Sequence, residues 1–194
     1  MTTIRAFTLT EMMITLAIFS LVVIAMVSLQ IFGFKLNALT SNKMRSTASS
    51  LKVLDQIGNL VLGATNTALI GNINANNNTF IAIAINRTAI GNALQISNNA
   101  TSYTTFYLNT DHILYQLGSA TNSQPVPLAS AVYNPQPFQA EDYRGTNILV
   151  GASGHYTIKI TLQYSNWLYA MPSTVYDTYR LESRATPRAQ FNSN

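Results

Sequence analysis

The chain of 194 residues contains no cysteine, and this absence excludes several kinds of site. Disulfide bridges, thiol nucleophiles, cysteine-ligated zinc and lipid attachment through an N-terminal cysteine are all ruled out. The absence does not identify a compartment, because a chain without cysteine suits an oxidising environment as well as a reducing one.

Charge is also scarce, since Asp, Glu, Lys and Arg make up only 9% of the residues, against about 25% in an average soluble protein. The net charge of +4 is spread along the chain without a block of like charge. Because binding to phosphates needs a basic patch or stripe, contact with nucleic acid is not predicted. Asn, Ser and Thr supply the polarity instead, which is a tendency of exported proteins.

Recurrent catalytic motifs are missing as well. The sequence has no HExxH, GxSxG, Walker-type or GxGxxG spacing. The best material for an enzyme would be Asp111-His112, Glu141-Asp142 and His155. A histidine beside an aspartate in a turn is more typical of a solvated turn than of a catalytic pair. We therefore predict a protein that is not an enzyme and has no cofactor.

One metal site stays open as an alternative. The carboxylates of Glu141 and Asp142 could contribute to a calcium site together with loop carbonyls, because hard cations prefer oxygen ligands. The spacing of these residues matches no calcium-binding loop.

What the sequence does have is a long apolar run near its start. Between Met12 and Phe34 the polar side chains are only those of Thr15, Ser20, Ser28 and Gln30. A helix of this length spans about 35 Å at ~1.5 Å per residue, which is enough for a bilayer core of ~30 Å. Apolar residues cover every face, so an ordinary amphipathic surface helix is excluded.

Three other interpretations of this run are weaker. A secretory signal peptide needs a shorter apolar core and a cleavage site directly after it. A buried core helix of this length is too much for so small a domain. A plain membrane anchor suits the length but leaves Glu11 unexplained, because a carboxylate in lipid is costly.

The residues before the run carry a more specific pattern. Arg5-Ala6 is followed by Phe7-Thr8-Leu9-Thr10-Glu11 and then by the apolar residues. This pattern resembles the class III signal of type IV pilins and type II secretion pseudopilins. The resemblance implies that a prepilin peptidase cuts between Ala6 and Phe7, that Phe7 becomes N-methylated and that Glu11 is the fifth mature residue. Ala6 stands where the family usually has Gly, which could slow the cleavage.

The resemblance also implies partners and a location. Glu11 would pair with the positive amino terminus of an adjacent subunit, so that two costly buried charges compensate each other and fix the axial register. The partners would be sister pilins or pseudopilins, the prepilin peptidase, and an assembly platform with a cytoplasmic ATPase. The protein would cross the bacterial inner membrane once, with a periplasmic or extracellular head, and join a filament after assembly.

The rest of the chain predicts an α+β fold. Apolar residues recur at helical spacing beyond Phe34, namely at Leu36, Leu39, Met44, Ala48, Leu51, Leu54, Ile57 and Val61. We therefore expect one long helix whose first half crosses the membrane and whose second half packs on an antiparallel sheet, as in pilins. The predicted divisions are a leader (1–6), a transmembrane half (7–34), an amphipathic half (35–66) and a β-rich head (67–194).

Alternation of apolar and polar residues predicts the strands of the head. They are expected at Thr79–Ile85, Ala93–Ser97, Tyr103–Leu108, Ile113–Leu117, Tyr156–Tyr164 and Val175–Ser183. Asn72–Asn78 is expected to be an Asn-rich loop. Residues 119–155 are expected to form an extended loop with short edge strands, because four prolines exclude a central strand from much of it.

The head carries a second, weaker resemblance. A strand, an Asp-containing turn and a Leu-Tyr strand (Tyr103–Leu117) precede Leu128-Ala129-Ser130-Ala131-Val132, a late strand (Ile158–Leu162) and a terminal Arg-bearing strand (Tyr179–Arg184). This order resembles J-type minor pseudopilins and W-type minor pilins. Glu11 argues against the K-type tip subunit, which usually lacks that acid. The alternative from another class is a single-pass anchored binding domain, such as an adhesin, that does not polymerise.

Overall fold

The computed structural model of the protein describes residues 8–74, 79–97, 99, 102–119, 123–150, 155–169 and 175–188. The chain divides into two compact units, Met1–Arg45 and Ser46–Asn194. The one helix of the described residues, α1 (Leu9–Gly63), runs through the end of the first unit and into the second. No proline interrupts it, because the first proline of the chain is Pro125.

The first unit consists of the apolar part of α1. The helix is long and apolar enough to cross a membrane from Leu9 to Ser41, with a mean hydropathy of 2.6, and none of that stretch is buried. The predicted span therefore forms as a helix. The divisions predicted after residues 6 and 34 stay predictions.

The second unit contains the last turns of α1 and two antiparallel sheets. The six-stranded sheet has the order β2-β1-β4-β5-β6-β7, and the four-stranded sheet has the order β10-β9-β8-β3. The bounds of the strands are β1 Thr67–Asn74, β2 Thr79–Ala82, β3 Ile90–Gly91, β4 Ala93–Ser97, β5 Tyr103–Leu108, β6 Leu114–Gly118, β7 Val126–Ala129, β8 Phe138–Glu141, β9 Thr157–Tyr169 and β10 Val175–Ala185.

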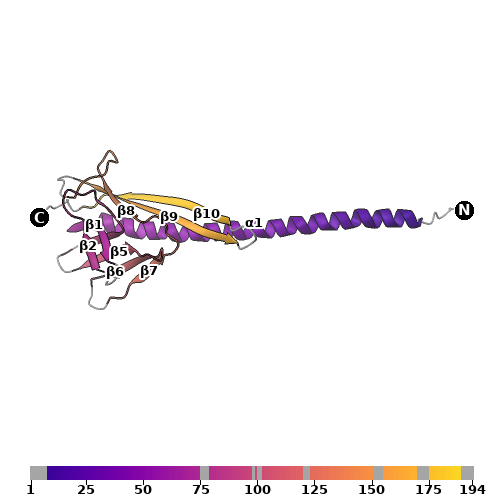
Figure 1. Ribbon diagram of the computed structural model, residues 1–194, viewed down its shortest axis with the longest axis horizontal. Coiled ribbons are helices and arrows are strands. Elements are labelled where there is room, and N and C mark those ends of the chain that lie inside the picture. Colours follow the sequence, from indigo (N-terminus) through magenta and orange to yellow (C-terminus); the bar gives the residue numbers. More distant parts are fainter. Residues whose placement is uncertain are drawn as a thin grey trace. The chain divides into compact units, whose positions relative to one another are not determined.

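In Figure 1 the strands of the two sheets flank this last part of α1. The buried residues of all three elements form one apolar cluster, with Ile57 from the helix, Phe106 from β5 and Ile160 from β9 all fully buried. Two polar contacts tie the helix to the sheets: Gln56 donates to Gln116 on β6 at 2.9 Å, and Ser50 lies 3.3 Å from the hydroxyl of Tyr179 on β10. The prediction of an amphipathic helix packed on an antiparallel sheet is confirmed.

The predicted apolar stripe of the helix is only partly right. Leu54, Ile57 and Val61 are buried, but Met44 and Leu51 are exposed. The buried surface also includes Ser50 and Val53, which the stripe left out. The helix contacts sheets on more than one side, so its buried face is wider than a single stripe.

Most strand predictions are confirmed within a few residues. The alternation in β9 is borne out, because Tyr156, Ile158, Ile160, Leu162 and Tyr164 are each at most 3% exposed. Two expectations are wrong.

The first error concerns β1, which occupies part of the predicted Asn-rich loop. Asn72 and Asn74 pair with Ile81 and Thr79 of β2, and residues 75–78 lie outside the described residues. The second error concerns β8, which lies between β9 and β3 and is not an edge strand. β7, which contains Pro127, is an edge strand as expected.

Gly91 allows the two sheets to approach each other closely, and Gly71 allows a close contact within the six-stranded sheet. A Cβ on Gly91 of β3 would lie 2.0 Å from the carbonyl oxygen of Gly71 in β1. A Cβ on Gly71 would lie 2.4 Å from the carbonyl oxygen of Ile81. Both obstacles are backbone atoms, so neither can move aside as a side chain could.

We therefore predict that Gly91→Ala lowers the stability of the head. Overpacking of this kind costs about 1–3 kcal/mol, which corresponds to a fall of about 2–12 °C in Tm for a chain of this size. Thermal unfolding of the full chain in detergent micelles, followed by circular dichroism of the β signal, measures the shift.

Gly63→Ala is the matched control, because a Cβ on this last helical residue meets nothing within 4 Å. Its Tm should be unchanged or slightly higher, since alanine favours helix over glycine. Equal Tm values for the two variants would contradict the close approach of the sheets.

Candidate functional site

The apolar part of α1 leaves its side chains uncovered in the single chain. Leu16 is 71% exposed, Phe19 67% and Leu29 73%. An apolar surface of this extent marks contact with a membrane or with another protein. Because residues on all faces of the helix share this exposure, the surface suits lipid or a bundle of similar helices more than a groove on one side.

Two polar side chains of this stretch, Thr15 and Ser20, form hydrogen bonds within the helix. The Thr15 hydroxyl donates to the carbonyl oxygens of Glu11 and Met12, both at 2.9 Å, and the Ser20 hydroxyl donates to Ala17 at 2.8 Å. Such bonds to the preceding turn let a hydroxyl enter an apolar medium without an unpaired donor. These residues therefore do not interrupt the span.

Glu11 closes a capping box at the start of α1. The Thr8 amide and the Thr8 hydroxyl both donate to Glu11 Oε2 at 2.9 Å, and the Glu11 amide donates to Thr8 Oγ1 at 3.3 Å. The pattern Thr-x-x-Glu before an apolar run is a recognised helix start. This capping box was not predicted, although the spacing Thr8-Leu9-Thr10-Glu11 is visible in the sequence.

The capping box gives Glu11 a role within one chain. It satisfies amide and hydroxyl donors at the helix start and places a negative charge where the helix dipole favours it. The predicted cleavage site, Ala6 and Phe7, lies outside the described residues. Cleavage, methylation of Phe7 and the pairing of Glu11 between subunits therefore stay predictions.

His112 is held firmly in the turn between β5 and β6. Its φ of 61° is left-handed, its amide donates to the Asn109 carbonyl at 3.1 Å, and its carbonyl accepts from the Val132 amide at 3.0 Å. The ring stacks on Tyr133 with centroids 4.3 Å apart, and Nδ1 lies 3.2 Å from the Val132 carbonyl oxygen. A carbonyl only accepts, so Nδ1 carries the proton.

The candidate pair Asp111-His112 does not form a catalytic unit in this arrangement. The Asp111 carboxylate accepts from the Asn109 side chain at 3.4 Å, whereas the imidazole binds a backbone carbonyl. His155 is exposed and lies just before β9. In the described part of the chain, no three His, Asp or Glu residues are grouped so that they could hold a metal ion.

Glu141 and Asp142 have separate partners. Glu141 is 2% exposed, and its two carboxylate oxygens bind Lys159 Nζ at 3.0 Å and Arg184 Nε at 3.1 Å. Asp142 Oδ1 accepts from the backbone amides of Arg144 and Thr146, both at 2.8 Å. Both carboxylates are thus used by the fold, and the calcium site stays a prediction.

Two tyrosines, Tyr107 and Tyr156, are buried in the head. Tyr156 is 3% exposed, and its hydroxyl donates to the Ala68 carbonyl on β1 at 2.8 Å. Burial raises the pKa of Tyr156 to about 12, although the hydrogen bond to Ala68 acts in the opposite direction. Burial and the neighbouring Tyr115 raise the pKa of Tyr107, whose ring stacks on Tyr115 at 5.5 Å. The Tyr156 hydrogen bond connects the residue just before β9 to β1 of the other sheet.

We predict that Tyr156→Phe destabilises the head by about 1 kcal/mol near neutral pH, because the Ala68 carbonyl loses its partner. The folded state keeps the Tyr156 proton up to about pH 12, whereas an unfolded tyrosine loses it near pH ~10. The stabilisation is therefore complete below pH ~10 and is lost as the pH rises toward about 12. The deficit of the variant should shrink over that interval.

Denaturant unfolding of the full chain in micelles at several pH values measures this deficit. Tyr143→Phe is the control, because Tyr143 is 84% exposed and loses the same hydroxyl without burial. A deficit that stays constant from pH ~9 to ~12, or one equal to that of the control, would contradict the role given to Tyr156.

Comparison with known proteins addresses the start of the chain. Residues 1–27 match the family model described as the prokaryotic N-terminal methylation motif. No curated protein and no solved structure matches the chain. The matched residues include Ala6, Phe7, Thr8 and Glu11 and more than half of the candidate membrane span.

The matched motif and the fold together define the class of the protein. The chain carries the N-terminal signal of type IV pilins and pseudopilins, followed by a long apolar helix and antiparallel β-sheets. Its first 27 residues thus match the signal of a type IV pilin-like or pseudopilin-like protein, and its fold is consistent with one. The signal points to a structural protein rather than an enzyme, to processing by prepilin peptidase and to assembly with other pilins.

Proposed function

We propose that the protein is a structural subunit, of the minor kind, in a type IV pilus-like or type II secretion-like filament. The observation that carries this proposal is an uncovered apolar helix whose first part, with the Glu11 carboxylate in its first turn, lies within a methylation motif. The precursor is held in the inner membrane by its apolar helix. After cleavage between Ala6 and Phe7 it joins a bundle of similar helices.

The burial of the helix surface supplies the driving force for retention in either environment. In the membrane, lipid chains cover side chains such as Phe19 and Leu29. In the filament, the helices of sister subunits cover them. Because both surroundings are apolar, the transfer itself gives little specificity, and close packing or polar contacts must select the register.

Glu11 is the residue proposed to select that register. In the single chain its carboxylate accepts from Thr8, which is a neutral partner. In the filament it would exchange or share this partner with the methylated amino group of Phe7 on an adjacent subunit. A pair of opposite charges in an apolar bundle acts chiefly as a specificity device, since a misplaced subunit would leave both charges unpaired.

The head supports the minor role through the order of its strands. Tyr103–Leu108 and Leu114–Gly118 form the predicted hairpin, and Val175–Ala185 is the terminal Arg-bearing strand of the J-type and W-type resemblance. The head would give the filament part of its surface or its initiating end. The alternative is an anchored binding domain that never polymerises.

The pairing of charges can be separated from the capping box by two substitutions. Glu11→Gln keeps the box, because Gln serves at this position as well as Glu, but it removes the charge. Thr8→Val removes the hydroxyl of the box and keeps the charge. We expect Glu11→Gln to reduce co-assembly with sister subunits about tenfold or more, and Thr8→Val to assemble nearly normally.

The measurement is the fraction of the subunit that co-purifies with sheared filaments, with total membrane content and N-terminal processing recorded for each variant. Normal assembly of Glu11→Gln together with failure of Thr8→Val would assign Glu11 to the helix cap and overturn its pairing between subunits. Failure of the unaltered chain to enter filaments of a strain that contains its sister subunits would favour the anchored domain.

A further inference from the structure

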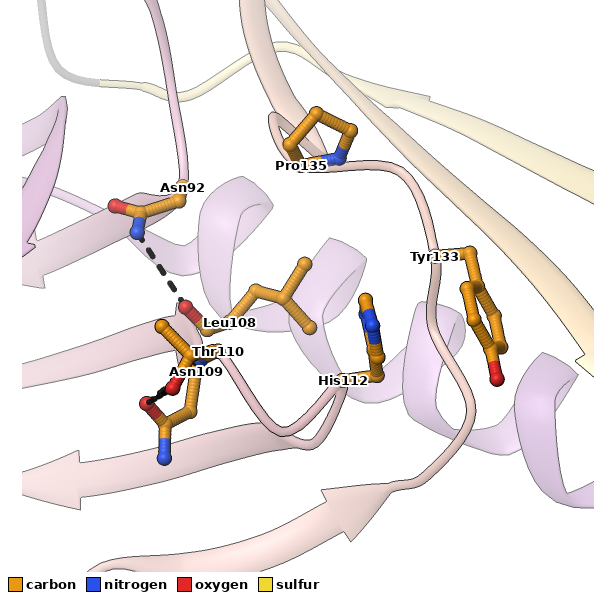
Figure 2. A pocket seen from close by; sticks show the side chains of 7 residues that line it. All are labelled: Asn92, Leu108, Asn109, Thr110, His112, Tyr133 and Pro135. Carbon is orange, nitrogen blue, oxygen red and sulfur yellow. Dashed lines mark hydrogen bonds between the residues drawn. The ribbon is translucent and has the colours of Figure 1, made fainter.

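A small hollow in the head lies beside the turn that joins β5 to β6. Its volume is about 190 Å³, and it is lined by Asn92, Leu108, Asn109, Thr110, His112, Tyr133 and Pro135. Figure 2 shows His112 between Tyr133 on one side and Leu108 on the other, with Pro135 above and the two asparagines opposite. The hollow is smaller than the ~300–1,000 Å³ of a site for a drug-sized ligand. It therefore suits a ligand of about one ring.

Flat and apolar surfaces form part of the wall. One face of the His112 ring stacks on Tyr133, which leaves the other face for the hollow. The Pro135 ring and the Leu108 side chain complete this part of the lining. Such a wall suits the C–H face of a saturated ring, because the face of an aromatic ring is electron-rich and attracts weakly positive hydrogens.

The polar groups of the wall keep unused bonding capacity. One N–H of Asn92 donates to the Leu108 carbonyl at 3.4 Å, and one N–H of Asn109 donates to Asp111, so each amide retains a second N–H. The Thr110 hydroxyl donates to Asn109 Oδ1 and retains its lone pairs. His112 binds through Nδ1, and no bond to Nε2 is formed by the residues that the structure describes, so in the neutral imidazole this nitrogen is an acceptor.

This combination of donors and acceptors selects the chemistry of a ligand. None of the seven lining residues carries a permanent charge, so a carboxylate, a phosphate or an ammonium group would find no opposite charge in the wall to offset the loss of its hydration. An apolar side chain would leave the remaining N–H groups and lone pairs without bonds. Hydroxyl groups donate and accept at once and would satisfy both kinds of group.

We propose that this hollow binds one ring of a neutral sugar, either a hexose or an N-acetylhexosamine. The ring packs its C–H face against His112 and Pro135, and its hydroxyls accept from Asn92 and Asn109 and donate to Thr110 and His112. Contact with a single ring makes the affinity weak, with a Kd on the order of millimolar. Several copies of the head on one filament would strengthen it by multivalency.

The site is pre-organised rather than formed by the ligand. His112 is fixed by the stacking of its ring on Tyr133 and by the hydrogen bonds of its own backbone amide and carbonyl. Asn92 Oδ1 accepts from the backbone amide of Ile73 on β1 at 2.9 Å, and this bond fixes the side-chain amide of Asn92. A ligand therefore loses little affinity to the ordering of side chains.

The test is a titration of the full chain in dodecylphosphocholine micelles, a detergent without a sugar head group. The probes are glucose and N-acetylglucosamine, with glucuronate, glucosamine and N-acetylprolinamide as comparisons. The readout is the NMR shift of the Thr110 methyl group and of the His112 ring. We expect saturable shifts with at least one neutral sugar and none with the charged sugars or the proline derivative.

The variants are His112→Asn, which keeps a residue that tolerates the left-handed backbone but removes the flat ring, and Thr110→Val, which removes the hydroxyl. Each should raise the Kd about tenfold or more. His155→Asn is the matched control, because it changes the other histidine at an exposed position outside the hollow, and its Kd should equal that of the unaltered chain.

Absence of shifts at Thr110 and His112 with both neutral sugars would overturn the proposal. So would a Kd that is unchanged in both pocket variants, or tighter binding of a charged sugar. Tighter binding of N-acetylprolinamide would identify the hollow as a dock for a side chain of a protein partner instead. The titration uses the single chain in micelles, so its result is independent of whether the protein assembles into filaments.

Discussion

The uncovered apolar surface of α1 is the constraint on which the organisation of this protein depends. Side chains such as Leu16 and Phe19 are mostly exposed along a stretch that is hydrophobic on every face. No soluble state of a single chain can accommodate that surface at low cost, so a membrane or other helices must cover it. The first part of this surface lies within residues 1–27, which match the methylation motif. Glu11 at its start is the residue proposed to distinguish a correct neighbour from an incorrect one.

Because of the capping box, the Glu11 carboxylate is not an unpaired group in the single chain. In the single chain the Glu11 carboxylate accepts hydrogen bonds from the amide and the hydroxyl of Thr8. The carboxylate therefore already has hydrogen-bond partners before assembly. In the proposed assembly, a cationic donor would replace neutral ones, and no orphaned charge would need a partner. The gain from this exchange is smaller than the pairing of a bare carboxylate would suggest, which is why selection of register is a better description than stabilisation. The head contains the reverse case, because the buried Glu141 already has both Lys159 and Arg184 as cationic partners.

The parts of the structure that depend on local pattern could be predicted from the sequence. The apolar run and the alternation in β9 each predict an element that formed, because both depend on burial of a repeated face. The errors have a different origin. β1 contains asparagines and was expected to be a loop, but pairing with both β2 and β4 outweighs the weak strand preference of Asn72. The exposure of Leu51 and the burial of Val53 follow from two sheets around the helix, which no single-stripe pattern contains. The hollow beside His112 could not be predicted, because Tyr133 and Pro135 lie beside the turn only through tertiary contacts.

Mass spectrometry of the N-terminal peptide from the native membrane protein tests the account most directly. We predict that, in cells with an active prepilin peptidase, the mature chain begins at Phe7 and carries one methyl group on its amino terminus. That terminus would place a cationic amine at the end of the helix and supply the partner proposed for Glu11. An intact chain beginning at Met1 in the same cells would contradict the account, because the uncovered helix would then be an anchor and not the stem of a filament subunit.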